Sequence, residues 1–564
     1  MLSVCLIFLY VLLVAYSVGF LVLTGIRRFC VGRNREDGEE SFWKEMKADS
    51  YCMAGLLVLT VYAQFFSLFY KVGLAANLLL LAICAVTVVV LRKELYERLL
   101  AVKGKWTLGT IAFSLFLFLL FAYGTSRGII HYDTGLYHGQ SIRWIEEYGV
   151  VKGLGNLHCR LAYNSSAFSL SALFSFSFLG IQSYHCMAGL FALLLAKVCA
   201  EIAYAWKRGR LILSDFARIA CIYYLLIIYD EMVSPASDYF MVLTIFYIVI
   251  RYLDLLEREE ELWVPYGLLC LLGVYAMSLK LSAALILLLV IKPAVILIRR
   301  KNLGAILSFI GLGALIITPY LIRNVIISGW LVYPFTAVDF FDVDWKIPKG
   351  IADYDSKEIQ VWGRGIYDVT RFEEPLGRWL PEWLKGLGMI DKLSVLIAAV
   401  SVIALVFAAI FIIGKRQKDK YDWLLVAVTV DLSFLFWLLS APLIRYGCVY
   451  VWLASVVTLG GIALYTIRSR TLWKAIYTLL CLAACYKLFA FGSEIAMAYD
   501  GNNFVMQKDY EDFETVAYEV DGVIIYYPVQ GDRVGYAAFP SSPAVADVML
   551  RKEEIQEGFR YREK

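Results

Sequence analysis

The segment DKLSVLIAAVSVIALVFAAIFII, from Asp391 to Ile413, decides the class of fold. After its first two residues it contains no charged side chain, and its length matches the roughly 20 residues that a helix needs to cross the hydrocarbon core of a bilayer. It lacks the alternation of a strand, and strands cross lipid only as closed barrels. The segment therefore predicts a transmembrane helix.

Similar apolar runs recur along the 564 residues, of which 60% are hydrophobic and 18% charged. Soluble domains are roughly 45–50% apolar, so the composition indicates a body that faces lipid. The sequence predicts an all-α integral membrane bundle of about fourteen transmembrane helices. We expect them at 2–25, 51–70, 73–91, 107–124, 184–205, 211–229, 237–252, 263–279, 281–298, 303–321, 391–413, 421–440, 446–466 and 472–490.

Basic residues predict the orientation, because basic loops stay cytoplasmic. They cluster at Arg27/Arg28/Arg33/Arg35, Arg92/Lys93/Arg98/Lys103/Lys105, Lys207/Arg208/Arg210, Arg299/Arg300/Lys301, Lys415/Arg416/Lys418/Lys420 and Arg468/Arg470/Lys474. All six clusters fall on one side if the stretch SSAFSLSALFSFSFLG (Ser165–Gly180) lies in the interface or re-enters instead of spanning. Its six serines suit an interfacial helix. Both termini are then predicted to be extracytoplasmic.

This topology divides the chain into a transmembrane domain, residues 1–490, and an extracytoplasmic tail, residues 491–564. The transmembrane domain carries two sizeable outward loops, 126–164 and 323–391. In the tail, a strand-like run at Val523–Tyr527 and turn residues at Gly531-Asp532 predict a small α+β appendage.

The first outward loop contains the most polar chemistry, in the run HYDTGLYHGQSIRWIEEYGVVKGLGNLHCRLAYNSS (His131–Ser166). A helix read from Asp133 puts Asp133, Tyr137, Gln140 and Trp144 on one stripe. Such a helix could lie flat on the membrane with its acid, phenol and indole facing one side. The same pattern also fits an N-capping Asp followed by an aromatic belt.

The spacing of Asp133 and Tyr137 behind a transmembrane helix resembles the first extracytoplasmic loop of GT-C class membrane glycosyltransferases. That class includes the protein O-mannosyltransferases and the aminoarabinose transferases. The run from Asp133 to Ser166, DTGLYH…SIRW…GLGNLH…NSS, and LIRNVIISGWLVYPF (Leu321–Phe335) are also similar to segments of a group of bacterial multi-pass proteins. Thr134 stands where many mannosyltransferase-like members carry Glu.

The resemblance implies a GT-C-like bundle in the bacterial inner (plasma) membrane. It further implies transfer of a sugar from a polyprenyl-phosphate carrier to a glycan, lipid or protein acceptor at the outer face. Asp133 is then the catalytic base for the acceptor hydroxyl, or a ligand of a divalent cation such as Mg or Mn. The bilayer is the other expected partner, and no nucleic acid is expected.

Further side chains are candidates for substrate binding. In the first loop they are Tyr137, His138 and His158, and the short loop YDEMVSPASDY adds Asp230, Glu231 and Asp238. Lys280, Arg323 and Arg445 interrupt apolar runs at what the topology predicts to be one depth, where they could grip a phosphate. Helix capping and snorkelling to lipid headgroups are the alternatives for these acids and cations.

Two other functions stay open. An O-antigen polymerase or ligase also has many spans and outward arginines, and the loop at Arg323–Asp391 fits it. A transporter or flippase of lipid-linked glycans would place charges near the midplane in two related halves. The charges here gather at one face without an internal repeat, which favours surface chemistry.

Overall fold

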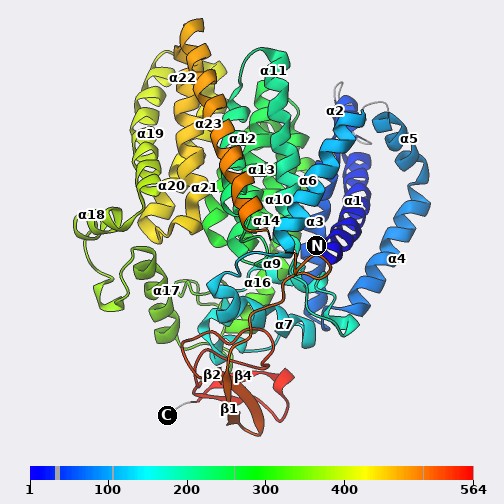
Figure 1. Ribbon diagram of the computed structural model, residues 1–564, viewed down its shortest axis with the longest axis vertical. Helices are drawn as coiled ribbons and strands as arrows, with labels where there is room; N and C mark the ends of the chain where they lie inside the picture. The colour runs from blue at the N-terminus through cyan, green and yellow to red at the C-terminus, as the bar shows by residue number, and fades with distance from the viewer. Residues whose placement is uncertain (32–38, 104–106, 260, 500, 563–564) are drawn as a thin grey trace.

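The computed structural model describes residues 1–31, 39–103, 107–259, 261–499 and 501–562, and most of these are helical (Figure 1). Within them, eleven helical segments are long and apolar enough to cross a membrane. They are α1 (Leu2–Val31), α3 (Ala48–Ser67), α6 (Leu108–Ser126), α10–α11 (Met187–Cys199, Tyr204–Arg208), α13 (Ser237–Glu257), η5–α15 (Leu281–Val290, Ile291–Arg299), α16 (Leu303–Ser328), α19 (Met389–Gly414), α20 (Tyr421–Ser440), α21–α22 (Ile444–Leu453, Gly460–Thr466) and α23 (Arg470–Met497).

The remaining three of the fourteen expected segments are helical but shorter. α12 (Leu213–Ile227) has 15 residues, and α4 (Leu74–Val90) and α14 (Trp263–Leu279) have 17 each. α4 bends by 77° into α5 (Arg92–Lys103), so this pair is either one broken span or a re-entrant segment. The multi-pass helical fold agrees with the sequence, whereas the number of fourteen crossings stays a prediction.

Glycines allow the closest helix pair in the bundle to form. A Cβ on Gly19 of α1 would lie 1.9 Å from the Tyr51 carbonyl oxygen, and one on Gly55 of α3 would lie 1.8 Å from the Ala15 carbonyl oxygen. Membrane helices gain packing energy by such close backbone approach, because lipid gives no hydrophobic drive for their association. These two glycines therefore lock α1 against α3.

The serine-rich stretch does not form a spanning helix. α9 (Ser166–Leu173) has eight residues, and all of them are buried. Eight helical residues are too few to cross the bilayer. α9 packs inside the protein against α3 and α7 (Gly139–Glu147), and its position at the interface or as a re-entrant segment stays a prediction. The Ser166 hydroxyl bonds to that of Ser278 (2.9 Å), whereas the buried hydroxyls of Ser169 and Ser171 have no hydrogen-bond partner within the described part of the chain.

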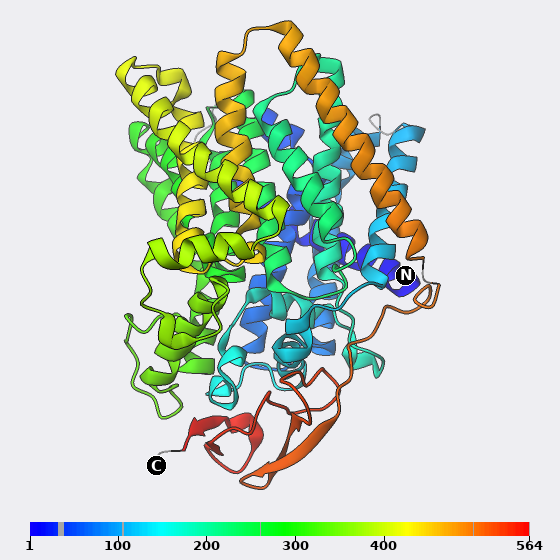
Figure 2. The same ribbon diagram turned by 60° about the vertical axis from the view of Figure 1, so that its left-hand side comes forward.

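The two outward loops and the tail lie together at one end of the bundle, which we call the tail end (Figures 1 and 2). The first loop forms η1 (Thr134–His138), α7, α8 (Leu154–Leu157) and η2 (Cys159–Ala162), and the second forms α17 (Lys349–Gly363) and α18 (Leu376–Gly386). α2 (Glu39–Glu45) lies at the opposite end. The side of the membrane that each end faces stays a prediction, and Arg33, Arg35 and Lys105 lie outside the described residues.

The tail folds as two antiparallel strand pairs. β1 (Thr515–Val520) pairs with β2 (Val523–Pro528), and β3 (Val548–Leu550) pairs with β4 (Phe559–Tyr561). The predicted strand at Val523–Tyr527 is confirmed. The predicted α component is not: α23 continues to Met497, and residues 501–562 contain no α-helix. The appendage is thus a small β structure.

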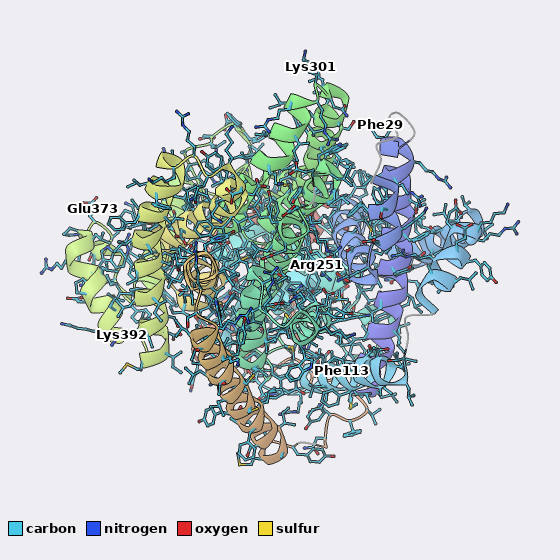
Figure 3. All side chains as sticks on the ribbon, turned by 90° about the horizontal axis from the view of Figure 1, so that it is seen from above. Phe29, Phe113, Arg251, Lys301, Glu373 and Lys392 are labelled. Atoms are coloured by element: carbon cyan, nitrogen blue, oxygen red, sulfur yellow. The ribbon has the colours of Figure 1, made fainter. Side chains whose placement is uncertain are left out.

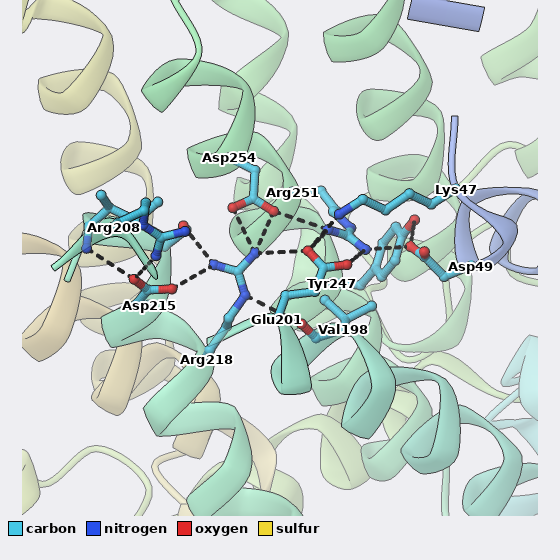
Figure 4. Close-up of polar contacts among 12 residues, drawn as sticks. Lys47, Asp49, Val198, Glu201, Arg208, Asp215, Arg218, Tyr247, Arg251 and Asp254 are labelled. Atoms are coloured by element: carbon cyan, nitrogen blue, oxygen red, sulfur yellow. Dashed lines mark hydrogen bonds and ion pairs between the residues drawn. The ribbon is translucent and has the colours of Figure 1, made fainter. Parts of the chain in front are cut away.

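A buried ionic network ties helices together away from the tail end (Figure 4). It comprises four cations and four carboxylates: Lys47, Asp49, Glu201, Arg208, Asp215, Arg218, Arg251 and Asp254. The Nη2 group of Arg218 donates to both carboxylate oxygens of Asp254, with N–O distances of 2.7 and 2.6 Å. Seen along the bundle axis, Arg251 lies near the middle and Lys301 at the periphery (Figure 3). The network links α3, η4 (Ala200–Ala203), α11, α12 and α13.

Candidate functional site

Four charged side chains from four separate segments meet at the tail end. Asp133 directly precedes the π-helical turn η1, and Asp238 lies in the first turn of α13. Lys280 has extended backbone between α14 and η5, and Arg445 lies in the first turn of α21. We call these residues the Asp133 cluster. Each sits where a helix begins or breaks, so its charged group stays near the polar end of the bundle.

Ion pairs connect the whole cluster. Arg445 Nη2 lies 2.5 Å from Asp133 Oδ2, and its Nε lies 3.8 Å from Asp238 Oδ2. Lys280 donates to the other oxygen of Asp238. The side chains of Asp133 and Asp238 are 14% and 10% exposed, against 32% for Arg445 and 24% for Lys280. The cations are therefore the more accessible half of a cluster whose formal charges cancel.

Two aromatic residues complete the site, and sequence reasoning missed both. The imidazole of His131 contacts Arg445 and lies 3.9 Å from Asp133. The Lys280 ammonium lies 3.4 Å from the centre of the Tyr446 ring, a cation–π contact. The only signal in the sequence that points to these two residues is their position: His131 lies two residues before Asp133, and Tyr446 directly follows Arg445.

The surroundings of Asp133 keep its carboxylate ionised. Burial by itself raises the pKa of Asp133, but Arg445, followed by His138 and His131, outweighs burial and holds this pKa below its ordinary value. Burial, and then Arg445, lower the pKa of His131. At neutral pH the site thus contains a charged carboxylate beside a neutral imidazole.

The predicted stripe of Asp133, Tyr137, Gln140 and Trp144 is wrong. Residues 134–138 form a π-turn before α7 begins at Gly139, and a π-turn contains more residues than an α-turn. Gln140 and Trp144 therefore rotate away from Asp133. Tyr137 packs edge-on against Tyr163, with ring centres 5.7 Å apart. Gln140 and Trp144 turn to the tail instead of facing lipid.

The tail covers this π-turn. The backbone N–H groups of Val534 and Gly535 both donate to the Gly135 carbonyl, at 2.9 and 2.8 Å. Arg143 donates to the carbonyls of Tyr536 and Ala537 at 2.7 Å each, and its guanidinium also lies over the Tyr536 ring. The segment that carries Asp133 is thus held from outside by the C-terminal β structure.

The other histidines and Tyr137 lie outside the ion pairs. His138 neighbours the cluster, but it is buried, and burial lowers its pKa to about 3. The Nδ1 atom of His158 accepts from the Arg160 backbone at 3.3 Å, and burial lowers the pKa of this residue to about 4. Burial raises the pKa of the Tyr137 phenol well above its ordinary value. All three are uncharged at neutral pH.

The remaining candidates have separate partners. Asp230 pairs with Arg127 at 3.1 Å, and Glu231 accepts from the Tyr239 hydroxyl at 2.5 Å. Arg323 is 3% exposed and donates to Asn164 and Ser67. The expectation that Arg323, Lys280 and Arg445 act on one phosphate is therefore not met, because Arg323 is enclosed by α3 and the loop around Asn164.

The polar side chains around Asp133 are not arranged as a site for a divalent cation. Among the described residues, no group of three or more His, Cys, Asp or Glu side chains is arranged to hold a metal ion. The oxygens of Asp133 and Asp238 already face Arg445 and Lys280. A divalent cation needs several oxygen ligands at one point, so these residues do not fit one.

The apolar helices and the Asp133 cluster define a multi-pass membrane protein with an ionic site at one end. Residues 1–452 match the model of a family described as a domain of unknown function, DUF8201, and the chain belongs to this family. The matched range includes all four residues of the Asp133 cluster and ends before the tail. No curated protein and no solved structure matches the chain.

Proposed function

We propose that this protein is a GT-C type glycosyltransferase that moves a sugar from a polyprenyl-phosphate carrier to an acceptor hydroxyl at the extracytoplasmic face. The observation that carries the proposal is the contact of Asp133 with Arg445 at 2.5 Å, beside the second pair of Lys280 and Asp238. A carboxylate and two partly exposed cations at one end of the helical bundle suit a lipid-phosphate substrate, whose tail would stay in the bilayer.

In the proposed reaction, the acceptor O–H gives its proton to an Asp133 carboxylate oxygen. The acceptor oxygen forms a bond to the anomeric carbon of the sugar, and the bond from that carbon to the phosphate oxygen breaks. The electron pair leaves with the phosphate, which Arg445 and Lys280 stabilise. When Arg445 turns to the phosphate, Asp133 loses its stabilising cation, so its pKa rises and it becomes a stronger base.

The test is Asp133→Asn in proteoliposomes supplied with a polyprenyl-phosphate hexose whose sugar is radiolabelled. We expect transfer to fall by about a thousandfold or more, because the amide cannot take the proton. Membrane insertion and thermal stability should stay close to wild type. Asp344→Asn is the matched control, since Asp344 pairs with Arg551 at 2.9 Å on the same end of the molecule. Retained transfer by Asp133→Asn would remove the proposed base.

A specific observation favours a second candidate, translocation of a lipid-linked glycan. A cavity of about 1090 Å³ opens among α12, α13, α20, α22 and α23, lined by charged and aromatic side chains such as Lys292, Asp422, Trp423 and Tyr477. An amphipathic hollow of this size could admit a glycan headgroup. Measuring movement of the labelled lipid between leaflets, in parallel with sugar transfer, separates the two functions. Translocation without transfer would favour the second candidate.

A further inference from the structure

Arg323 is a buried cation whose hydrogen-bond acceptors are both neutral. Its side chain lies in the last turns of α16, and its Nε and Nη1 atoms donate to Asn164 Oδ1 at 3.0 Å and to Ser67 Oγ at 2.5 Å. Both acceptors are neutral. Over the ranges that the structure describes, no carboxylate forms an ion pair with Arg323, although other buried arginines, such as Arg127 and Arg218, have at least one each.

A buried cation without an anion is expensive. Removing the partner of a buried pair costs roughly 3–5 kcal/mol, because the remaining charge is neither solvated nor neutralised. The carbonyl end of α16 offsets part of this, but a helix terminus contributes only about 0.3–1 kcal/mol in ordinary geometries, rising to about 2 when partly buried. Hydrogen bonds to neutral oxygens reduce the desolvation penalty without cancelling the charge. The site therefore lacks a negative charge.

A small cavity adjoins the Arg323 side chain. Arg323, Asn164 and Tyr163 line it, together with Ser141 and Trp144 of α7. The volume open to the centre of a water-sized sphere is about 10 Å³. This is close to the minimum that one water-sized particle needs.

Two further donors on the cavity wall are unsatisfied. The Ser141 hydroxyl and the Trp144 indole N–H are buried, and neither has a hydrogen-bond partner within the described part of the chain. Buried polar groups nearly always have a partner, so two orphans beside one uncompensated cation call for an explanation. A water molecule would satisfy the donors but would leave the charge of Arg323 uncompensated.

We propose that this cavity between α7 and α16 binds a small monovalent anion of the chloride class, held by the Arg323 guanidinium with the Ser141 hydroxyl and the Trp144 indole N–H. The anion supplies the missing charge and accepts from donors that α7 and α16 contribute separately. It would thereby fasten the helix that follows the Asp133 turn to the transmembrane bundle. This site is distinct from the Asp133 cluster and does not depend on the proposed transferase activity.

The test compares thermal unfolding of the purified full chain in sodium chloride, sodium bromide and sodium gluconate at equal ionic strength. Because a ligand that binds only the folded state stabilises it, we expect the midpoint to be about 2 °C or more higher in chloride and bromide than in gluconate. Arg323→Gln should abolish this difference. Arg127→Gln should retain it, since Arg127 has its own carboxylate, Asp230. Equal midpoints in the three salts, or the same chloride effect in Arg323→Gln, would overturn the proposal.

A second measurement covers the case in which Arg323→Gln fails to fold. Crystals of the wild-type chain grown in bromide should give an anomalous peak in the cavity, within hydrogen-bond distance of the Arg323 guanidinium. An anomalous map without a peak there, in crystals that diffract well enough to reveal ordered bromide elsewhere, would mean that the cavity holds water and that the anion site does not exist.

Discussion

Arg445 is the side chain through which the two carboxylates of the Asp133 cluster are joined. Its planar guanidinium reaches Asp133 with Nη2 while its Nε approaches Asp238. A lysine at this position could reach one of them but not both, because an ammonium is a single point of charge. The charge state of the proposed base therefore depends on this one residue.

Replacing Arg445 should change the pH dependence of transfer. In Arg445→Gln, Asp133 keeps its burial but loses its main cation, so its pKa rises. The acid limb of the kcat/KM profile should move to higher pH, and the rate at neutral pH should fall by about a hundredfold. Arg445→Lys should recover part of the rate. An acid limb at the same pH in wild type and Arg445→Gln would contradict the pairing.

The sequence indicated which charged residues form the Asp133 cluster, but it did not indicate which residues lie beside them. Asp133 could be chosen from its spacing to Tyr137 in the first outward loop, and Asp238 as an acid of a later outward loop. Lys280 and Arg445 could be chosen because charges that interrupt apolar runs are costly unless they are used. The same rule also selected Arg323, which lies elsewhere, since hydropathy gives depth along the membrane normal but not lateral position. His131 and Tyr446 carry no comparable penalty, so nothing marked them.

Among the elements, the tail has the clearest structural role. Residues 534–537 hold the π-turn and Arg143 of α7, so the tail braces the segment from which Asp133 projects. Sequence periodicity predicted an unbroken helix here, because a π-turn adds one residue without any signature in hydropathy. The tail contacts come from residues some 400 positions away and could not be predicted at all.

Removing the brace should loosen the Asp133 segment. In Arg143→Ala, two hydrogen bonds to the tail and the stack on Tyr536 disappear. We expect hydrogen exchange of residues 133–147 to rise by about tenfold, as for a local opening made easier by roughly 1.4 kcal/mol. The matched control is Arg551→Ala, which breaks a tail contact to the Asp344 loop instead. Unchanged exchange in Arg143→Ala would mean that the tail covers this segment without holding it.

The ionic network of α3, α12 and α13 should dominate stability away from the tail end. Arg218→Ala leaves Asp215 and Asp254 with fewer cations in a buried setting, where losing one partner costs about 3–5 kcal/mol. Arg28→Ala is the comparison, because the side chains of Arg28 and Glu94 are 60% and 36% exposed and such pairs contribute about 1 kcal/mol or less. Thermal unfolding in detergent measures both. Similar midpoints for the two variants would show that the network is not stabilising.

At the scale of the whole molecule, the described chain is a helical bundle with an ionic site at one end and a buried salt-bridge network away from it. Composition and apolar periodicity predicted the bundle, because a spanning segment has to satisfy its own backbone hydrogen bonds as a helix. Composition and periodicity could not predict that α12 and α14 are shorter than a full membrane span, because these patterns do not show where a helix begins and ends. The β fold of the tail was predicted in part, from one strand-like run of β-branched and aromatic residues at Val523–Tyr527.

Stability should fall in mild acid because three histidines are buried without charge. Burial lowers the pKa of His138 to about 3 and those of His158 and His185 to about 4. An unfolded histidine titrates near 6.5, so the unfolded chain binds more protons between about pH 6.5 and 4. The stabilising contribution is complete above about pH 6.5 and is lost as the pH falls towards 4.

Thermal midpoints measured from pH 7.5 to 4.5 check this expectation. The midpoint should drop steadily below about pH 6.5, and His185→Gln should show a shallower slope than wild type. The lowered pKa of Asp133 acts in the same direction but only below about pH 4, so it does not interfere. A midpoint that stays constant to pH 4.5 would contradict the neutral state of these histidines.

The ten residues of η5, from Leu281 to Val290, form a 3₁₀ helix instead of an α-helix. A 3₁₀ helix rises about 2.0 Å per residue and an α-helix about 1.5 Å, so this segment advances about 20 Å where α geometry would give about 15 Å. The longer rise places the two ends of this segment about 5 Å farther apart than an α-helix of ten residues would, nearly one α-turn. Lys280, which follows α14 directly and pairs with Asp238, and Ile291, which begins α15, are therefore held farther apart than a continuous α-helix would hold them.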